Sequence, residues 1–228
     1  MFSKDARIAR LTALAALGVA LLYVVSVPIG SLASAPASDA SAATVLQFFS
    51  QHRDGLLVAV ALNGIAWCAL MPAVFAGLRA LLGERGGPAA TVALVCAGVE
   101  AALIGVALLF AALAAYATPH LGAELVKVLG DGSNIATSAS AWPTIPCVIG
   151  LVVAARHSGM LPRSAVVVGI AVAALHAVTA VAFARAGLLS PTGIALAAPP
   201  AFAIWMALIG VALLRRPVTV GAVAPAAA

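Results

Sequence analysis

The charged residues of this chain are gathered into short segments, and the long stretches between them are almost wholly apolar. Of the 228 residues, 64% are hydrophobic and only 8% are charged, and the mean hydropathy is +1.16. A water-soluble domain carries about 25% charged residues, because its surface must be covered by groups that water solvates. The composition therefore excludes a soluble globular enzyme, a disordered chain and a disulfide scaffold. It predicts a polytopic membrane protein.

Each apolar stretch is long enough to cross a bilayer as a helix, which takes about 20 residues. We predict an all-α helix bundle, a single transmembrane domain over residues 1–216, with six spans at 11–29, 55–82, 89–116, 134–155, 164–186 and 193–214. Residues 44–53 and 122–130 mix apolar and polar side chains, so we expect short interfacial helices there. The tail at 217–228 shows no periodic pattern, and we expect it to be loosely ordered in the cytoplasm.

The first apolar run admits a second interpretation. Ala33-Ser34-Ala35 resembles a signal-peptide cleavage site, which would make the preceding run a secretory signal. That run of about 19 residues is longer than the core of a typical signal peptide, about 7–15 residues. We therefore expect an uncleaved first span, and cleavage would leave the orientation of the other spans unchanged.

The distribution of Lys and Arg predicts the orientation of the bundle. With the N-terminus in the cytoplasm, the cytoplasmic ends of the spans hold nine basic residues and the outer ends hold three. The nine are Lys4, Arg7, Arg10, Arg79, Arg85, Arg156, Arg163, Arg215 and Arg216, and the three are Arg53, Lys127 and Arg185. Since cytoplasmic loops carry the excess of Lys and Arg, we predict that both termini are cytoplasmic. The preference for Arg over Lys and the abundant Ala favour a GC-rich bacterial genome, and so the inner (plasma) membrane.

Several functional classes have no support in the sequence. The net charge of +5 is spread over the ends of apolar runs and forms no basic stripe, so we expect no nucleic-acid partner. The three cysteines lie in separate apolar runs and make no metal-binding pair. No two histidines have metal-ligand spacing on one helix, and no phosphate-binding loop is present. We predict no metal and no cofactor.

Glu100 is the only acidic residue inside an apolar run. It lies about 17 Å into the third span at 1.5 Å per residue, close to the bilayer centre. An ionised carboxylate there costs at least about 2.5 kcal/mol. We therefore expect Glu100 to face the bundle interior and to be protonated, paired or in a wet cavity. Acids in this position frequently mark functional sites; the alternative is a protonated acid that only packs one helix on another.

His176 lies near the middle of the fifth span, and Thr179, three residues on, shares its face of the helix. Counting from the span ends places His176 at nearly the same depth as Glu100. If the third and fifth spans touch, this pair can relay a proton or act as general acid and base. We therefore name Glu100 and His176 as candidate catalytic residues. The alternative is a histidine that forms a helix–helix hydrogen bond.

Other polar and aromatic residues recur at helical spacing inside the spans. We predict that they line an outward-facing polar cavity with an aromatic wall, while the alternative is that they hold helices together in lipid. The candidates are Asn63, Trp67, Thr137, Ser140, Trp142, Thr144, Thr179 and Trp205.

Prolines interrupt three spans, at Pro72, at Pro143 and Pro146, and at Pro199-Pro200. Each removes a helical hydrogen bond and frees a carbonyl, which in lipid must find a partner or line a cavity. They predict either kinked, well-packed helices or broken helices at a binding site. Pro199-Pro200 lies near the outer end of its span, where it can simply begin the regular helix.

Two short motifs resemble a family of six-span bacterial membrane proteins catalogued as a domain of unknown function. Ser158-Gly159-Met160-Leu161-Pro162-Arg163 is similar to that family's inner loop, a Ser-Gly pair followed by an apolar pair and Pro-Arg. Gly98-Val99-Glu100-Ala101 resembles its third-span motif, a Val/Ile-Glu-Ala core after an Arg, and Gly98 stands here near the position of that Arg. The resemblance implies a six-helix inner-membrane fold and supplies no activity.

Two functions remain open from the sequence. The first is a small transporter-like or accessory membrane protein with a buried polar site around Glu100, in contact with membrane lipid and with a small apolar or amphipathic molecule. The second is a membrane-embedded, terpene-cyclase-like enzyme that acts on a lipid or isoprenoid, with Glu100 as general acid. A water-accessible path to Glu100 would favour the first, and a long apolar tunnel ending at Glu100 the second.

Overall fold

The computed structural model describes residues 4–184 and 186–216. The fold is all-α and 86% helical, and the described residues contain no strand. The predictions made for Arg185 and for the tail at 217–228 lie outside the described residues.

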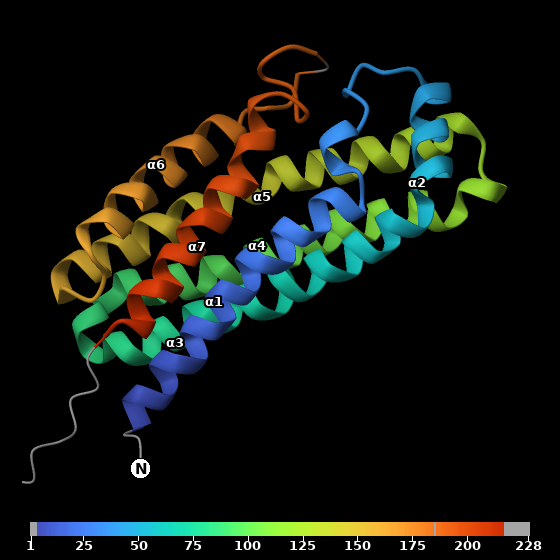
Figure 1. Ribbon diagram of the computed structural model, residues 1–228. Helices are drawn as coiled ribbons and strands as arrows, with labels where there is room; N and C mark the ends of the chain where they lie inside the picture. The colour runs from blue at the N-terminus through green and yellow to red at the C-terminus, as the bar shows by residue number, and fades with distance from the viewer. Residues whose placement is uncertain (1–3, 185, 217–228) are drawn as a thin grey trace, which may run out of the picture.

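Helices account for almost the whole described chain (Figure 1). The α-helices are α1 (Lys4–Ile29), α2 (Ala42–Asn63), α3 (Met71–Leu82), α4 (Gly87–Ala117), α5 (Ala123–Ser158), α6 (Arg163–Thr179) and α7 (Ala198–Leu214). A π-helical segment, Gly64–Leu70, joins α2 to α3 in one continuous rod. Short 3-10 turns lie at Leu32–Ser34, Gly83–Gly86, Thr118–His120 and Ile194–Ala197. Successive rods run up and down the bundle, so the start of α1 and the end of α7 lie at the same end (Figure 1).

Three helical stretches are long and apolar enough to cross a membrane: Lys4–Ile29, Ala42–His120 and Ala123–Ser158. The second of these includes the reversal at Gly83–Gly86, where α3 and α4 turn back on each other (Figure 1). α6 and α7 are apolar helices of 17 residues each. These lengths indicate a membrane helix bundle, and the number of spans stays a prediction.

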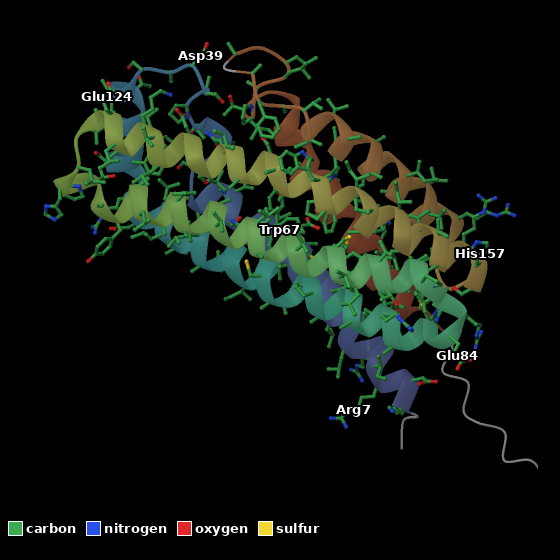
Figure 2. All side chains as sticks on the ribbon, turned by 180° about the vertical axis from the view of Figure 1, so that it is seen from behind. Arg7, Asp39, Trp67, Glu84, Glu124 and His157 are labelled. Carbon is green, nitrogen blue, oxygen red and sulfur yellow. The ribbon has the colours of Figure 1, made fainter. Side chains whose placement is uncertain are left out.

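The sides of the bundle are apolar and its ends are charged. Leu21, Val95, Leu109 and Val167 point outward with more than half of their surface exposed. Arg7, Glu84 and His157 lie at one end of the bundle, and Asp39 and Glu124 lie at the other (Figure 2). An exposed apolar belt of this extent on a water-soluble protein would drive association. In a membrane, the same apolar side chains would contact the lipid acyl chains.

Of the two segments predicted as short interfacial helices, 44–53 is a short helix that ends at a kink, whereas 122–130 is the beginning of a longer helix. α2 runs through 44–53 with a break at His52 (φ −113°, ψ 15°), and α5 continues without interruption from Ala123. Their apolar side chains, among them Val45, Phe49 and Val126, pack on each other and on α4 in a second small core. The protein itself covers these faces, so they need no membrane surface.

The predicted ends of the fifth and sixth spans are corrected by the structure. α6 ends at Thr179 rather than at residue 186, and α7 begins at Ala198 rather than at 193. Between them the chain forms a loop in which Gly187 adopts a left-handed φ of 81°. Pro199 and Pro200 lie in the first turn of α7, where a proline's missing N–H costs no hydrogen bond.

The prolines of the other spans have different consequences. Pro143 and Pro146 lie inside α5, which continues through them. Pro72 begins α3 directly after the π-helical segment, in which the N–H of Met71 donates to the carbonyl of Ala66, five residues back. The proline cannot donate to a carbonyl of the preceding turn. The helical rod continues from α2 into α3 through the π-helical segment, which takes up the missing hydrogen bond. π-helical segments occur frequently at functional sites.

Candidate functional site

An elongated cavity of about 230 Å³ lies inside the bundle. Its wall is made by α1, α2 with the π-segment, α4, α5, α6 and the start of α7. On α4 the lining residues run from Glu100 to Ala111, which is about 16 Å at 1.5 Å per residue. Glu100 is the innermost of them. Leu32, Pro191 and Leu196, from the two connecting loops, line the opposite end. Trp67, on the wall, lies midway between the two charged ends (Figure 2).

Hydrogen bonds join the two loops at the outer end of the cavity. The N–H of Ser38 donates to Thr192 Oγ1 at 3.0 Å, and the two hydroxyl oxygens are also 3.0 Å apart. Lys127 Nζ donates to the carbonyl of Ser38 at 3.1 Å and forms an ion pair with Asp131. The loops that contribute Leu32 and Pro191 to the lining are therefore held together by side chains from three parts of the chain.

Glu100 is buried at the inner end of the cavity, with 2% of its surface exposed. Its carboxyl lies near Thr144 on α5, whose hydroxyl donates to the carbonyl of Ser140 at 2.8 Å. Its second oxygen, Oε2, is buried and has no hydrogen-bond partner. The ion pairs of the described chain join Arg53 to Asp54 and Lys127 to Asp131, so neither reaches Glu100. The site thus presents a carboxyl oxygen that the protein leaves unsatisfied.

His176 lines the same cavity from α6 and is buried. Its Nδ1 donates to the carbonyl of Val172 at 2.8 Å, and its ring meets that of Phe202 edge-on with centroids 6.0 Å apart. Among the described residues no hydrogen bond or ion pair joins His176 to Glu100. The structure brings the two candidate catalytic residues to one cavity, and their functional coupling stays a prediction.

Asn63 is the centre of a buried hydrogen-bond network at the entrance to the π-segment. Its Nδ2 donates to Ser26 Oγ on α1 and to the carbonyl of Ala59, both at 2.9 Å. Its Oδ1 accepts from Trp67 Nε1 at 3.1 Å. The Trp67 ring packs edge-on against Tyr23, with centroids 6.1 Å apart. The network fixes the aromatic wall of the cavity and ties α1 to α2.

The cavity brings together part of the polar set predicted from the sequence. Lining residues from that set are Asn63, Trp67, Thr137, Ser140 and Thr179.

The other three predicted residues have different places. Thr144 is fully buried; it lies near Glu100 but is not a lining residue of the cavity. Trp142 is 57% exposed on the outside of α5 and donates Nε1 to the carbonyl of Ala180 at 2.9 Å, where α6 ends. Trp205 is fully buried in the core and donates Nε1 to the carbonyl of Ala165 at 2.8 Å. The prediction that Trp142 and Trp205 line the cavity is therefore wrong: both indoles satisfy a backbone carbonyl of a neighbouring helix.

Sequence reasoning missed lining residues on α1 and α5. Tyr23 and the network partner Ser26 are three residues apart on α1, so they share a helix face. That spacing was a usable signal for a polar face of the first span. Ser133 and Ser138 also line the cavity, in the outer half of α5.

Comparison of the chain with protein families, with characterised proteins and with solved structures finds no match. Among the described residues no group of three His, Cys, Asp or Glu side chains is placed to hold a metal ion. The site is therefore interpreted from its own geometry.

Replacing Asn63 tests the network. Asn63→Ala leaves the buried Trp67 N–H without its acceptor, which costs about 1–3 kcal/mol, whereas the Ser26 hydroxyl keeps its hydrogen bond to the carbonyl of Tyr23. We expect a lower free energy of unfolding and a lower thermal midpoint in lipid nanodiscs. Asn134→Ala is the matched control, because Asn134 also lines the cavity but makes no described side-chain hydrogen bond. Equal midpoints for the two variants would contradict the structural role of Asn63.

Proposed function

We propose that this chain is a multi-pass protein of the bacterial inner membrane with six spans and both termini in the cytoplasm. The rods α1, α2–α3, α4, α5, α6 and α7 alternate in direction. Among the described residues, nine basic side chains belong to the ends predicted as cytoplasmic, and two, Arg53 and Lys127, to the opposite ends. α6 ends at Thr179, before it would cross the bilayer as a helix. Non-helical backbone after it is tolerated because the loop lines a cavity instead of contacting lipid. The proposed membership of the six-span family of unknown function agrees with this arrangement.

A single cysteine at position 222 tests the orientation, in a variant whose three native cysteines are replaced by alanine. We expect it to react only with reagents that enter the cytoplasm. Labelling from the outside in intact cells would contradict the proposal.

We propose further that the protein binds a small amphipathic molecule in its central cavity, as a transporter-like or accessory membrane protein. The observation that carries this proposal is a cavity that ends at a buried carboxyl oxygen without a protein partner. An unsatisfied buried polar group costs about 1–3 kcal/mol. A group that served packing alone would be satisfied by its neighbours; one that serves a ligand is satisfied when the ligand arrives.

The composition of the wall supports an amphipathic ligand. α2 and α4 supply mostly apolar side chains, such as Leu56, Ile104 and Leu108, whereas α5 supplies Thr137 and Ser140. The volume of about 230 Å³ lies just below the range typical of drug-sized ligands, about 300–1,000 Å³. A slender molecule with one polar group fits these walls. Its polar end would lie at Glu100 and its apolar body along α4.

One observation favours a second function, a membrane-embedded enzyme acting on a lipid or isoprenoid. The lined cavity does not continue past Glu100 on α4, so a chain entering it would meet the carboxyl end-on. A protonated carboxyl there can act as general acid on a bound double bond. Chemical conversion of an added isoprenoid, lost in Glu100→Gln, would favour the enzyme over a binding protein.

Blocking the cavity tests the binding function. Ala111 lines the cavity, and Ala111→Phe fills its outer half, so we expect at least a ten-fold loss of saturable binding of radiolabelled octan-1-ol to the protein in phosphatidylcholine nanodiscs. Ala102, on the outside of the same helix, gives the matched control Ala102→Phe, which should bind as the unaltered protein does. If the unaltered protein binds neither octan-1-ol nor octylamine beyond the level of empty nanodiscs, the proposal is wrong.

A further inference from the structure

More than half of the side-chain hydrogen-bond donors of the cavity wall are committed to partners within the protein, which biases the wall toward accepting hydrogen bonds. This bias bears on the ligand of the proposed binding function, on which the inference rests. The bias arises because many polar lining side chains already donate their protons in hydrogen bonds within the protein.

The lining hydroxyls of three threonine and serine residues are committed to the backbone of their own helices. Thr137 Oγ1 donates to the carbonyl of Ser133 at 2.9 Å, and Ser140 Oγ to that of Thr137 at 2.7 Å. Thr179 Oγ1 donates to the carbonyl of Leu175 at 3.1 Å. A hydroxyl has one proton and two lone pairs. Toward a ligand these three side chains therefore offer lone pairs.

The nitrogen donors of the wall are committed as well. Both protons of Asn63 Nδ2 go to Ser26 and Ala59, and the Trp67 N–H goes to Asn63. A carbonyl oxygen can only accept, so His176 Nδ1 carries the proton that it gives to Val172. In the neutral ring Nε2 then has a free lone pair.

Glu100 completes the set of acceptors. The Thr144 hydroxyl gives its only proton to the carbonyl of Ser140 at 2.8 Å, so it does not donate to Glu100. Oε2 keeps both lone pairs and has no partner. The protein supplies no cation here, because the lining contains neither Lys nor Arg.

The remaining polar lining groups do not reverse the bias. The side chains of Tyr23, Ser133, Asn134 and Ser138 are neutral and can each accept as well as donate. Trp67 and Tyr23 add aromatic faces, which attract a cation within about 6 Å of the ring centroid. An anion would meet a carboxyl and no positive charge.

We propose that the cavity selects small amphipathic amines, bound as the ammonium ion with its N–H groups directed at Glu100 and its apolar chain along α4. An ammonium ion brings the positive charge that the lining lacks, and its N–H groups match the lone pairs that the committed hydroxyls present. When it binds, the carboxyl proton leaves to water, so one positive charge replaces another and the cavity gains no net charge. A buried ion pair with satisfied hydrogen bonds is tolerated where an isolated charge is not.

Three probes with one chain length test this selection: octylamine, octan-1-ol and octanoate. They differ only in the head group, so the apolar contribution is held constant. Binding is measured to the full chain in phosphatidylcholine nanodiscs, with empty nanodiscs as the reference for partitioning into lipid. We expect octylamine to bind at least ten-fold more tightly than octan-1-ol, and octanoate to bind no more than it does to empty nanodiscs.

Glu100→Gln keeps the shape of the side chain and removes the acid. We expect the affinity for octylamine to fall by at least ten-fold in this variant and that for octan-1-ol to fall much less, because an amide oxygen still accepts a hydrogen bond from a hydroxyl. Glu124→Gln is the matched control, because it makes the same substitution at an exposed acid outside the cavity, and both affinities should stay as in the unaltered protein.

The outcomes separate this inference from the proposed binding function. Equal affinities for octylamine and octan-1-ol, or equal losses in the two Glu→Gln variants, would overturn the selection for amines and leave the binding function standing. Absence of binding by all three probes would overturn both. If Glu100→Gln loses octan-1-ol binding through misfolding, Thr137→Val decides: a larger loss for the amine than for the alcohol supports the inference, and equal losses overturn it.

Discussion

A carboxyl group held in the middle of an apolar bundle, without a cation from the protein, is the constraint on which the rest of this structure depends. Hydrocarbon provides no hydrogen bonds, so each polar group in the interior must be satisfied by the protein or by a ligand. Several polar side chains around the cavity meet this requirement by donating to carbonyls one helical turn back, as Thr137, Thr144 and Thr179 do. The oxygen Oε2 of Glu100 does not meet it.

The chemical character of the cavity follows from the same requirement. A hydroxyl that donates to its own helix is neutral and satisfied, and it still presents lone pairs to its surroundings. A wall built from such groups accepts hydrogen bonds and donates few. Hydrogen bonds to the backbone satisfy polar side chains inside a membrane helix, and they also leave lone pairs facing the cavity. The cavity therefore favours ligands that donate hydrogen bonds, and its lining contains neither Lys nor Arg.

The cavity exists because several helices depart from regular geometry beside it. The π-segment at Gly64–Leu70 carries Trp67 and begins directly after Asn63, whose hydrogen bonds to α1 hold the wall in place. α6 stops at Thr179, so its last turn lines the cavity and the following loop contributes Pro191 to the outer end. These local departures, rather than a shift of whole helices, make the space.

Much of this arrangement follows from sequence patterns that report on single helices. Charge scarcity predicted the all-α membrane bundle, and spacing along one helix predicted that Asn63 and Trp67 face the same way. Properties that depend on two helices could not be predicted. Trp142 and Trp205 find carbonyls on α6 or at its end, and one sequence does not contain that adjacency. The end of α6 was missed because the residues directly after Thr179 stay apolar, so the sequence contains no signal that the helix stops there.

The central claim is that Glu100 closes a ligand cavity and lacks a partner from the protein. An experimental structure of the chain in phosphatidylcholine nanodiscs, determined with and without octylamine at a resolution that shows side chains, tests it most directly. The account predicts an open cavity between α2, α4, α5 and α6 and additional density beside Glu100 in the sample with the amine. A carboxyl that points into the acyl chains, or that is fully hydrogen-bonded by neighbouring helices with no cavity beside it, would contradict the account.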